Sequence, residues 1–136
     1  MRHRRHNNRL KQKPGHARMF KRNLLTSLLL YESVRTTKKR ASVIAPEVDK
    51  LINFAKKHTP HVAIRHLNKT VTDTNASKKV MEVFIKRYAK RDSGLTRTVA
   101  AGFRPGDGAE VVDLSLVDGE VVVAPVEKKS PTKKSE

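Results

Sequence analysis

The stretch LTRTVAAGFRPGDGAEVVDLSLVD, residues 95–118, decides the fold class of this chain. Two segments rich in β-branched and aliphatic residues flank a centre of Gly, Pro and Asp, which is the pattern of an antiparallel hairpin. Pro105 fits the second position of a type II turn and Gly106 the third, because the proline ring fixes φ and glycine accepts the positive φ that follows. Every second residue from Val112 to Leu116 is aliphatic, so one face of the second strand is expected to be buried.

Helical periodicity fills most of the chain before this hairpin. Apolar residues recur at spacings of three and four over residues 17–31, 38–57 and 76–90, and a shorter pattern begins just beyond Pro60. Each pattern predicts an amphipathic helix. Pro46 interrupts the second helix, and we expect a bend there because an interior proline costs about 3 kcal/mol in a straight helix. The apolar faces expected to pack are Phe20, Leu24, Leu25, Leu28, Leu29 and Tyr31, then Ala41, Ile44, Val48, Leu51, Ile52 and Ala55, then Val62, Ile64 and Leu67, and last Val80, Val83, Phe84 and Tyr88.

A short β-branched segment separates the first two helices. It reads SVRTT and predicts a strand at 34–36, followed by Thr37 as the N-cap of the next helix. The order of elements is therefore α-β-α-α-α-β-β, which is typical of an α+β domain.

The composition divides the chain into one domain and two extensions. With 37 % hydrophobic and 32 % charged residues, part of the sequence is expected to stay outside any core. We predict a basic extension at 1–15, a single domain at 16–118 and a partly disordered C-terminal extension at 119–136. Within the last of these, residues 121–123 favour a strand by composition.

The charge indicates a polyanionic partner. The chain has 30 Lys and Arg residues against 13 Asp and Glu, a formal net charge of +17, and self-repulsion on that scale disfavours a compact state without counter-charge. The opening MRHRRHNNRLKQKPGHARMFKR holds no carboxylate, and the first acid is Glu32. A flexible cationic segment can lie between phosphates and release condensed counterions. A nucleic acid is therefore the expected partner, in preference to a purely solubilising role for the segment.

Two other partners fit the charge less well. An architectural DNA-binding protein would insert an apolar wedge into the minor groove, and no clear exposed wedge stands out in the sequence. A helix lying on an anionic membrane would need bulky apolar residues along one face, but the chain has no Trp and residues 1–16 hold Leu10 as their one large aliphatic side chain.

Catalytic and metal-binding patterns are not apparent. The chain has no Cys, and its serines lack a nucleophile-elbow context. The six His residues lack the carboxylates and the regular spacing of a metal site. We expect no enzymatic activity, no metal, no cofactor and no small-molecule substrate. No apolar run approaches the ~20 residues that cross a bilayer, so we also expect a soluble protein that is not exported.

Several short motifs occur in an order that resembles the bacterial ribosomal protein L17 family of the large subunit. They are MRHRR, HARMFKRNLLTSL, VRTT, LINFAKK, RYAKRDSGLTR and GFRPGD, and the resemblance runs from residue 1 to about 118. It implies a two-layer α/β domain in which the strand at 34–36 joins the hairpin to form a three-stranded sheet, with the helices on one side. The chain departs from the family pattern at Ser93 and Leu95, where the family usually has glycine and tyrosine.

The resemblance also implies a function and a set of contacts. It implies a structural, non-catalytic component of the large ribosomal subunit in the cytoplasm, which binds ribosomal RNA near the peptide exit tunnel and touches neighbouring large-subunit proteins. Motif positions predicted to contact RNA are Arg2, His3, Arg4, Arg5, His16, Arg18, Arg22, Asn23, Thr36, Thr37, Thr96, Arg97 and Arg104. The remaining predicted contacts belong to the same basic segments and are Arg9, Lys11, Lys13, Lys21, Arg35, Lys38 and Lys39.

Overall fold

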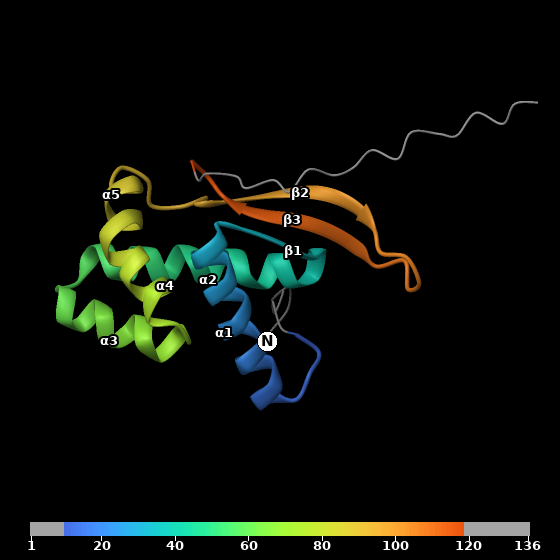
Figure 1. Ribbon diagram of the computed structural model, residues 1–136, viewed down its shortest axis with the longest axis horizontal. Coiled ribbons are helices and arrows are strands. Elements are labelled where there is room, and N and C mark those ends of the chain that lie inside the picture. Colours follow the sequence, from blue (N-terminus) through green and yellow to red (C-terminus); the bar gives the residue numbers. More distant parts are fainter. Residues whose placement is uncertain (1–9, 119–136) are drawn as a thin grey trace, which may run out of the picture.

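The computed structural model describes residues 10–118, and the strand expected at 121–123 lies outside them. The described residues form one layer of helices beneath one sheet (Figure 1). This confirms the predicted α+β class and the two-layer arrangement. In chain order the elements are α1 (Pro14–Tyr31), β1 (Ser33–Thr37), α2 (Lys38–Lys57), α3 (Pro60–Thr70), α4 (Thr74–Lys79), the π-helical η1 (Val80–Phe84), α5 (Ile85–Arg87), β2 (Thr96–Phe103) and β3 (Glu110–Leu116).

The last strand of the described residues is the central strand of the sheet. Within residues 10–118 the strand order is β1-β3-β2, and both pairings are antiparallel. The predicted hairpin is confirmed, and Gly106 has the expected positive φ of 102°. The β2–β3 register shifts between Ala100 and Gly102, which leaves Ala101 as the extra residue of a bulge. The bulge lies beside the turn and bends the free edge of β2.

A single hydrophobic core lies between the two layers. The six apolar positions predicted for α2 are all buried, and β3 buries every second residue as its alternation predicted. Phe84 and Tyr88 are also buried, which agrees with their prediction as core residues.

Four predicted core side chains point to solvent instead, and one of them is Val83 of η1, which is 37 % exposed. Tyr31 is 69 % exposed because α1 ends at this residue and Glu32 turns the chain with a left-handed φ of 59°. Val62 and Ile64 are exposed because α3 turns the small Ala63 and Leu67, four positions apart, toward the core. Periodicity over so short a helix did not distinguish between these faces.

The helices differ from their predicted forms in three places. The first begins at Pro14 and not at residue 17, with the proline in the first turn, where its missing N–H leaves no hydrogen bond unmade. The second runs through Pro46 as one helix, so the proline does not divide it, and the bend stays a prediction. The fourth, expected as one α-helix, contains the π-helical turn η1. Val80, Phe84 and Tyr88 follow each other at intervals of four and are all buried. A π-helical turn contains more residues than an α-helical turn, so it keeps these three side chains on the same, core-facing side of the helix.

Hydrogen bonds from the helical layer fix the ends of the sheet. The N–H of Leu116 donates to the carbonyl of Glu32 over 2.8 Å. The carboxylate of Asp49, in the middle of α2, accepts from the N–H groups of Gly94 and Leu95 over 3.1 and 3.2 Å. Leu95 is fully buried, so an aliphatic core residue occupies the position where the family usually has tyrosine.

Candidate nucleic-acid interface

The predicted RNA-contact residues fall into four groups. Five of them lie outside the described residues and are Arg2, His3, Arg4, Arg5 and Arg9. The others lie at the start of α1, at the junction of β1 with α2, and on the hairpin. The fold brings the β1–α2 junction close to the tip of the hairpin. Thr96 and Arg97 lie at the opposite end of β2.

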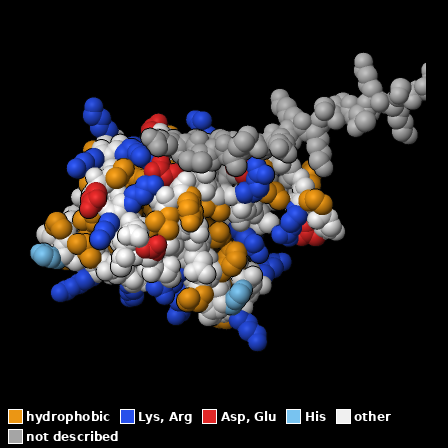
Figure 2. All heavy atoms as spheres, in the orientation of Figure 1, with side chains coloured by type: hydrophobic (Ala, Val, Ile, Leu, Met, Phe, Trp, Pro, Cys, Tyr) orange, Lys and Arg blue, Asp and Glu red, His pale blue; other side chains and the backbone are white. Residues whose placement is uncertain are grey.

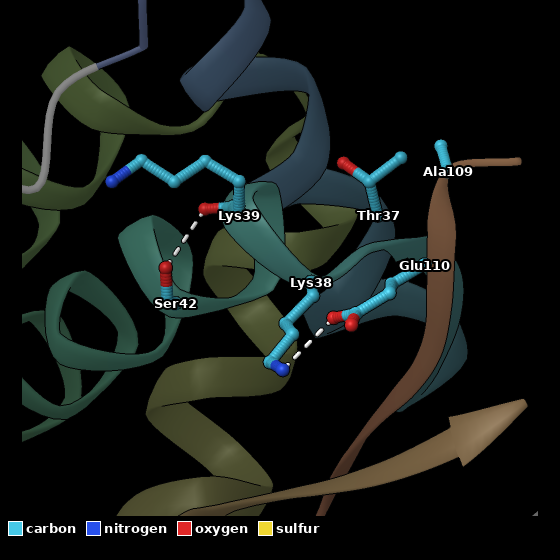
Figure 3. Close-up of a pocket in the computed structure, with 6 residues that line it drawn as sticks. All are labelled: Thr37, Lys38, Lys39, Ser42, Ala109 and Glu110. Carbon is cyan, nitrogen blue, oxygen red and sulfur yellow. Dashed lines mark hydrogen bonds and ion pairs between the residues drawn. The ribbon is translucent and has the colours of Figure 1, made fainter. Parts of the chain in front are cut away.

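The β1–α2 junction meets the hairpin tip around two shallow hollows. Lys38 and Lys39 line the first hollow with Glu110 from the start of β3 (Figure 3). Thr37 lines both hollows. The second, which we call the arginine hollow, is lined by Arg35, Thr36, Thr37, Arg40, Ala101, Phe103, Arg104, Pro105 and Val111. Six predicted contact residues from distant parts of the sequence therefore surround one place, although Thr36 is largely buried beneath it.

Three of the cations at this place are paired with the chain's own carboxylates. Arg35 lies opposite Asp113 in the β1–β3 register and donates to both of its oxygens, over 2.7 and 2.9 Å. Lys38 contacts Glu110 at 2.8 Å. The hydrogen bond from Arg35 lowers the pKa of Asp113, and that from Lys38 to Glu110 raises the pKa of Lys38.

Arg104 completes this set inside the turn. Its Nε donates to Asp107 Oδ1 over 3.0 Å, and its Nη2 to the other carboxylate oxygen. The guanidinium group and the N–H of Ala109 lower the pKa of Asp107 to about 2. The carboxylates of the hairpin thus meet basic partners within the chain. Three predicted RNA contacts therefore carry intramolecular ion pairs, which the sequence interpretation did not anticipate.

The first turns of α1 present a different kind of surface. Lys11, Lys13, His16, Arg18 and Asn23 are all exposed. Within the described part of the chain, none of them forms an ion pair or hydrogen bond with a carboxylate. These side chains are available to an external polyanion.

The next turn of the same helix is joined to α2 and α3. Lys21 contacts Glu47 of α2 at 3.7 Å, and Arg22 Nε donates to the carbonyl of Thr70 over 3.4 Å. The guanidinium carbon of Arg40 lies 4.4 Å from the centre of the Phe20 ring. Because Arg40 also lines the arginine hollow, the basic start of α1 and the hairpin tip border one another through α2.

Two residues at this interface were missed as contact residues. Arg40 ends the run KKR that opens α2, so the continuation of a basic run past Lys39 was a usable signal. The other is Phe103, which ends β2 and is 73 % exposed. In Figure 2, Lys and Arg side chains edge much of the visible face, with only scattered acids among them.

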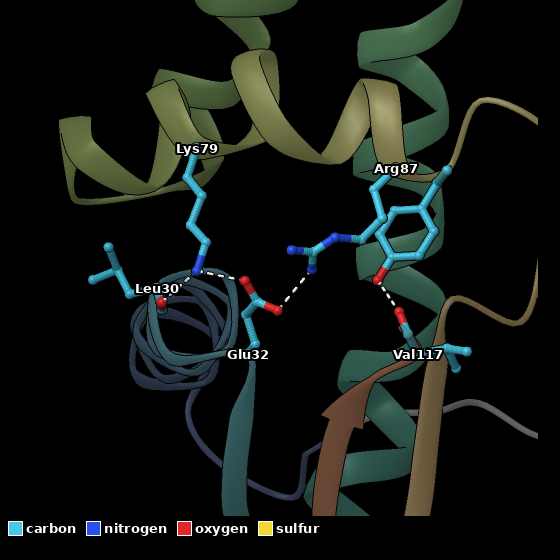
Figure 4. Close-up of polar contacts among 6 residues, drawn as sticks. Leu30, Glu32, Lys79, Arg87 and Val117 are labelled. Atoms are coloured by element: carbon cyan, nitrogen blue, oxygen red, sulfur yellow. Dashed lines mark hydrogen bonds and ion pairs between the residues drawn. The ribbon is translucent and has the colours of Figure 1, made fainter. Parts of the chain in front are cut away.

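Two cations of the fourth helical segment point toward the buried Glu32. Lys79 Nζ contacts Glu32 Oε1 at 2.7 Å, and Arg87 Nη1 contacts Glu32 Oε2 at 2.7 Å (Figure 4). The Glu32 side chain is only 9 % exposed. Burial raises the pKa of this carboxyl, but the hydrogen bonds from Arg87 and Lys79 outweigh burial, so its pKa lies below the ordinary value. These two residues are structural, because they neutralise a buried charge.

The remaining basic and aromatic groups suggest neither a metal site nor a membrane segment. The rings of His58 and His66 stack on Phe54, with centres 3.9 and 4.0 Å away. In residues 10–118 no three His, Asp or Glu side chains are grouped to hold a metal ion. Among the same residues, no helix has the length and apolarity that a bilayer crossing requires.

Comparison with known proteins gives one consistent family. A family model described as ribosomal protein L17 matches residues 20–117. The chain is 36 % identical over 135 residues to the large ribosomal subunit protein bL17 of Pelagibacter ubique, covering 98 % of this chain and 92 % of the relative. It is 39 % identical over 118 residues to the protein of the same name from Hyphomonas neptunium, covering 87 % and 84 %. The resemblance seen in the motifs is thereby confirmed, and this chain belongs to the ribosomal protein L17 family.

Proposed function

We propose that this chain binds ribosomal RNA within the large ribosomal subunit, near the peptide exit tunnel. As a member of its family, the chain is a structural constituent of that subunit and not an enzyme. The finer statements, namely the RNA contacts, the place in the subunit and contacts with neighbouring subunit proteins, are supported by the charge of the chain and by the motifs it shares with its family.

The observation that carries the RNA-binding proposal is the contrast between two sets of cations. At the hairpin tip, Arg35, Lys38 and Arg104 are neutralised by carboxylates of the chain. At the start of α1, Lys11, Lys13 and Arg18 are exposed, and no described carboxylate faces them. Part of the net charge of +17 therefore lies where an external polyanion can reach it.

The salt dependence of RNA binding tests this proposal. The full chain is titrated with large-subunit ribosomal RNA at several salt concentrations. For ~6–10 phosphate contacts, affinity is expected to fall ~10³–10⁵-fold between low and moderate salt. Replacing Lys11, Lys13 and Arg18 together by Gln should reduce the slope of log affinity against log salt by about 2–3.

A matched variant controls for the loss of charge alone. Lys50, Lys57 and Lys90 are equally exposed but lie on other parts of the molecule, so replacing these three by Gln should reduce the slope by less than one. Equal slopes for the two triple variants, or tighter binding to duplex DNA than to ribosomal RNA at equal salt, would overturn the proposal.

The place in the subunit needs a separate experiment. The chain has no Cys, so a single introduced Cys at exposed Lys90 gives one defined attachment point for a photocrosslinker. In assembled large subunits carrying a stalled nascent peptide, crosslinks are expected to reach components at the tunnel exit. Crosslinks confined to the face that meets the small subunit would contradict this placement.

A further inference from the structure

An exposed aromatic ring stands at the hairpin end of the molecule. Phe103 is the last residue of β2 and is 73 % exposed. It lines the arginine hollow with the side chains of Arg35, Arg40 and Arg104. Burying such a ring is worth roughly 1.5–3 kcal/mol, so a partner that covers it gains free energy.

The arginines around Phe103 are poorly placed to serve as phosphate clamps. Arg35 donates two N–H groups to the two oxygens of Asp113. Arg104 donates two N–H groups to the two oxygens of Asp107. Both carboxylates also repel phosphate. The Nε–Nη2 edge of each guanidinium group is therefore occupied by a carboxylate.

The faces of the same groups remain open. The Arg35 and Arg104 side chains are 59 % and 51 % exposed, and an edge-on ion pair holds a planar guanidinium group flat. A ring beside flat cations offers stacking surfaces for another planar group. Arg40 lies over the Phe20 ring and adds positive charge at the border of the hollow.

We propose that the arginine hollow receives an unpaired RNA base, which stacks on Phe103 beside the guanidinium faces of Arg35 and Arg104. The inference rests on the proposed RNA binding and names the RNA feature that this end of the molecule recognises. Unpaired bases in loops and bulges can be splayed out onto aromatic side chains. A continuous duplex keeps its base faces stacked internally, so it does not supply such a group.

A fluorescent variant reports stacking directly. Since the chain has no Trp, Phe103→Trp introduces a unique fluorophore at the hollow. Tyr31→Trp is the matched control, because Tyr31 is 69 % exposed and lies beyond the opposite end of β1. Short oligoadenylate is expected to quench the first variant strongly and the second weakly, whereas polyphosphate of equal charge should quench neither.

Affinity measurements give the second readout. Stacking of one base is worth ~1–3 kcal/mol, so Phe103→Ala should weaken oligoadenylate binding roughly 5- to 150-fold. The salt slope should be unchanged, and Phe103→Tyr should bind like the parent chain. Binding to duplex RNA should not respond to either substitution.

Several outcomes would overturn the inference. These are equal quenching of the two Trp variants, quenching by polyphosphate, or unchanged oligoadenylate affinity in Phe103→Ala. If Phe103→Trp responds to another large-subunit protein and to no RNA, the hollow belongs to a protein partner. Each of these results leaves the salt-dependent RNA binding of the α1 surface intact, whereas loss of that salt dependence removes the proposed function itself.

Discussion

Glu32 is the residue on which the joint between the helical layer and the sheet depends. It is buried, adopts a left-handed φ, accepts from two cations through its side chain and from Leu116 through its carbonyl. Removing one partner of a buried ionic group costs about 3–5 kcal/mol. Lys79 and Arg87 remain about a quarter exposed, which places the cost at the lower end of that range.

Glu32→Gln is therefore expected to lower the free energy of unfolding by about 3 kcal/mol. Urea denaturation followed by circular dichroism measures the change. The matched control is Glu82→Gln on η1, whose exposed side chain has no ion pair among the described residues; it should change stability by less than 0.5 kcal/mol. Equal effects of the two substitutions would show that the three-way contact contributes little.

The ion pair with Asp113 keeps the guanidinium edge of Arg35 from contacting an external phosphate. Asp113→Asn removes one partner of the cross-strand ion pair, so the Arg35 edge becomes free to contact phosphate. The slope of log affinity for ribosomal RNA against log salt should rise in magnitude by about 0.7–0.9. Asp92→Asn is the control, since it also removes one carboxylate but releases Lys56 of α2. A slope that rises equally in both variants would contradict the specific role of Asp113.

At the scale of elements, Asp49 connects α2 to the start of β2. Its carboxylate accepts two backbone N–H groups, one from Gly94 and one from the buried Leu95. Asp49→Ala leaves the N–H of Leu95 without its acceptor and should destabilise the domain by about 1–2 kcal/mol. Thermal unfolding measures this loss. The adjacent exposed Lys50→Ala should leave the unfolding midpoint nearly unchanged; a similar drop in that variant would point to helix propensity and not to the lost acceptor.

The element boundaries were largely predictable, but the directions of individual side chains were not. The helix at 38–57 and the Pro105–Gly106 turn depend on local rules of periodicity and φ, and both were found as predicted. Tyr31 was misassigned because the left-handed turn at Glu32 ends the helix before its stripe is complete. That β1 joins the hairpin in one sheet came from family resemblance, whereas the order β1-β3-β2 was not predicted, because periodicity within a strand carries no information about its neighbours.

The cations of the candidate site were predictable from the sequence, but the carboxylates with which they form ion pairs were not. The basic run from Arg35 to Lys39 and the arginine of the hairpin turn were identified from sequence. The Arg35–Asp113 pair depends on the register between two strands that lie 78 residues apart, which the sequence does not reveal. The exposure of Phe103 likewise depends on where the bulge at Ala101 turns the end of β2.

For the whole molecule, the carboxylates predict a loss of stability in acid. Glu32, Asp92, Asp107 and Asp113 all have pKa values below their ordinary ones, lowered by their cationic partners. The unfolded chain therefore binds more protons than the folded one as pH falls, and folded-state stability present at neutral pH is lost. The loss should begin near pH 4.5, the ordinary value for Glu32, and continue toward about 2, the pKa of Asp107.

Urea midpoints measured between neutral pH and this acid range test the linkage. Because Glu32 is the most buried of the four carboxylates, Glu32→Gln should make the urea midpoint depend less on pH and should also lower that midpoint. A midpoint that stays constant through the acid range, or a variant profile parallel to that of the parent chain, would contradict this account.

The position of β3 at the centre of the sheet has a consequence for synthesis. β1 and β2 do not pair with each other, and the only described strand partner of each is β3, the last of the described strands to be translated. A growing polypeptide that has not yet reached residue 110 thus contains the sequences of all the described helices and of β1 and β2, but not the strand with which β1 and β2 pair. The three-stranded sheet can therefore form only late, after Glu110–Leu116 has been synthesised and pairs with β1 and β2 at the same time.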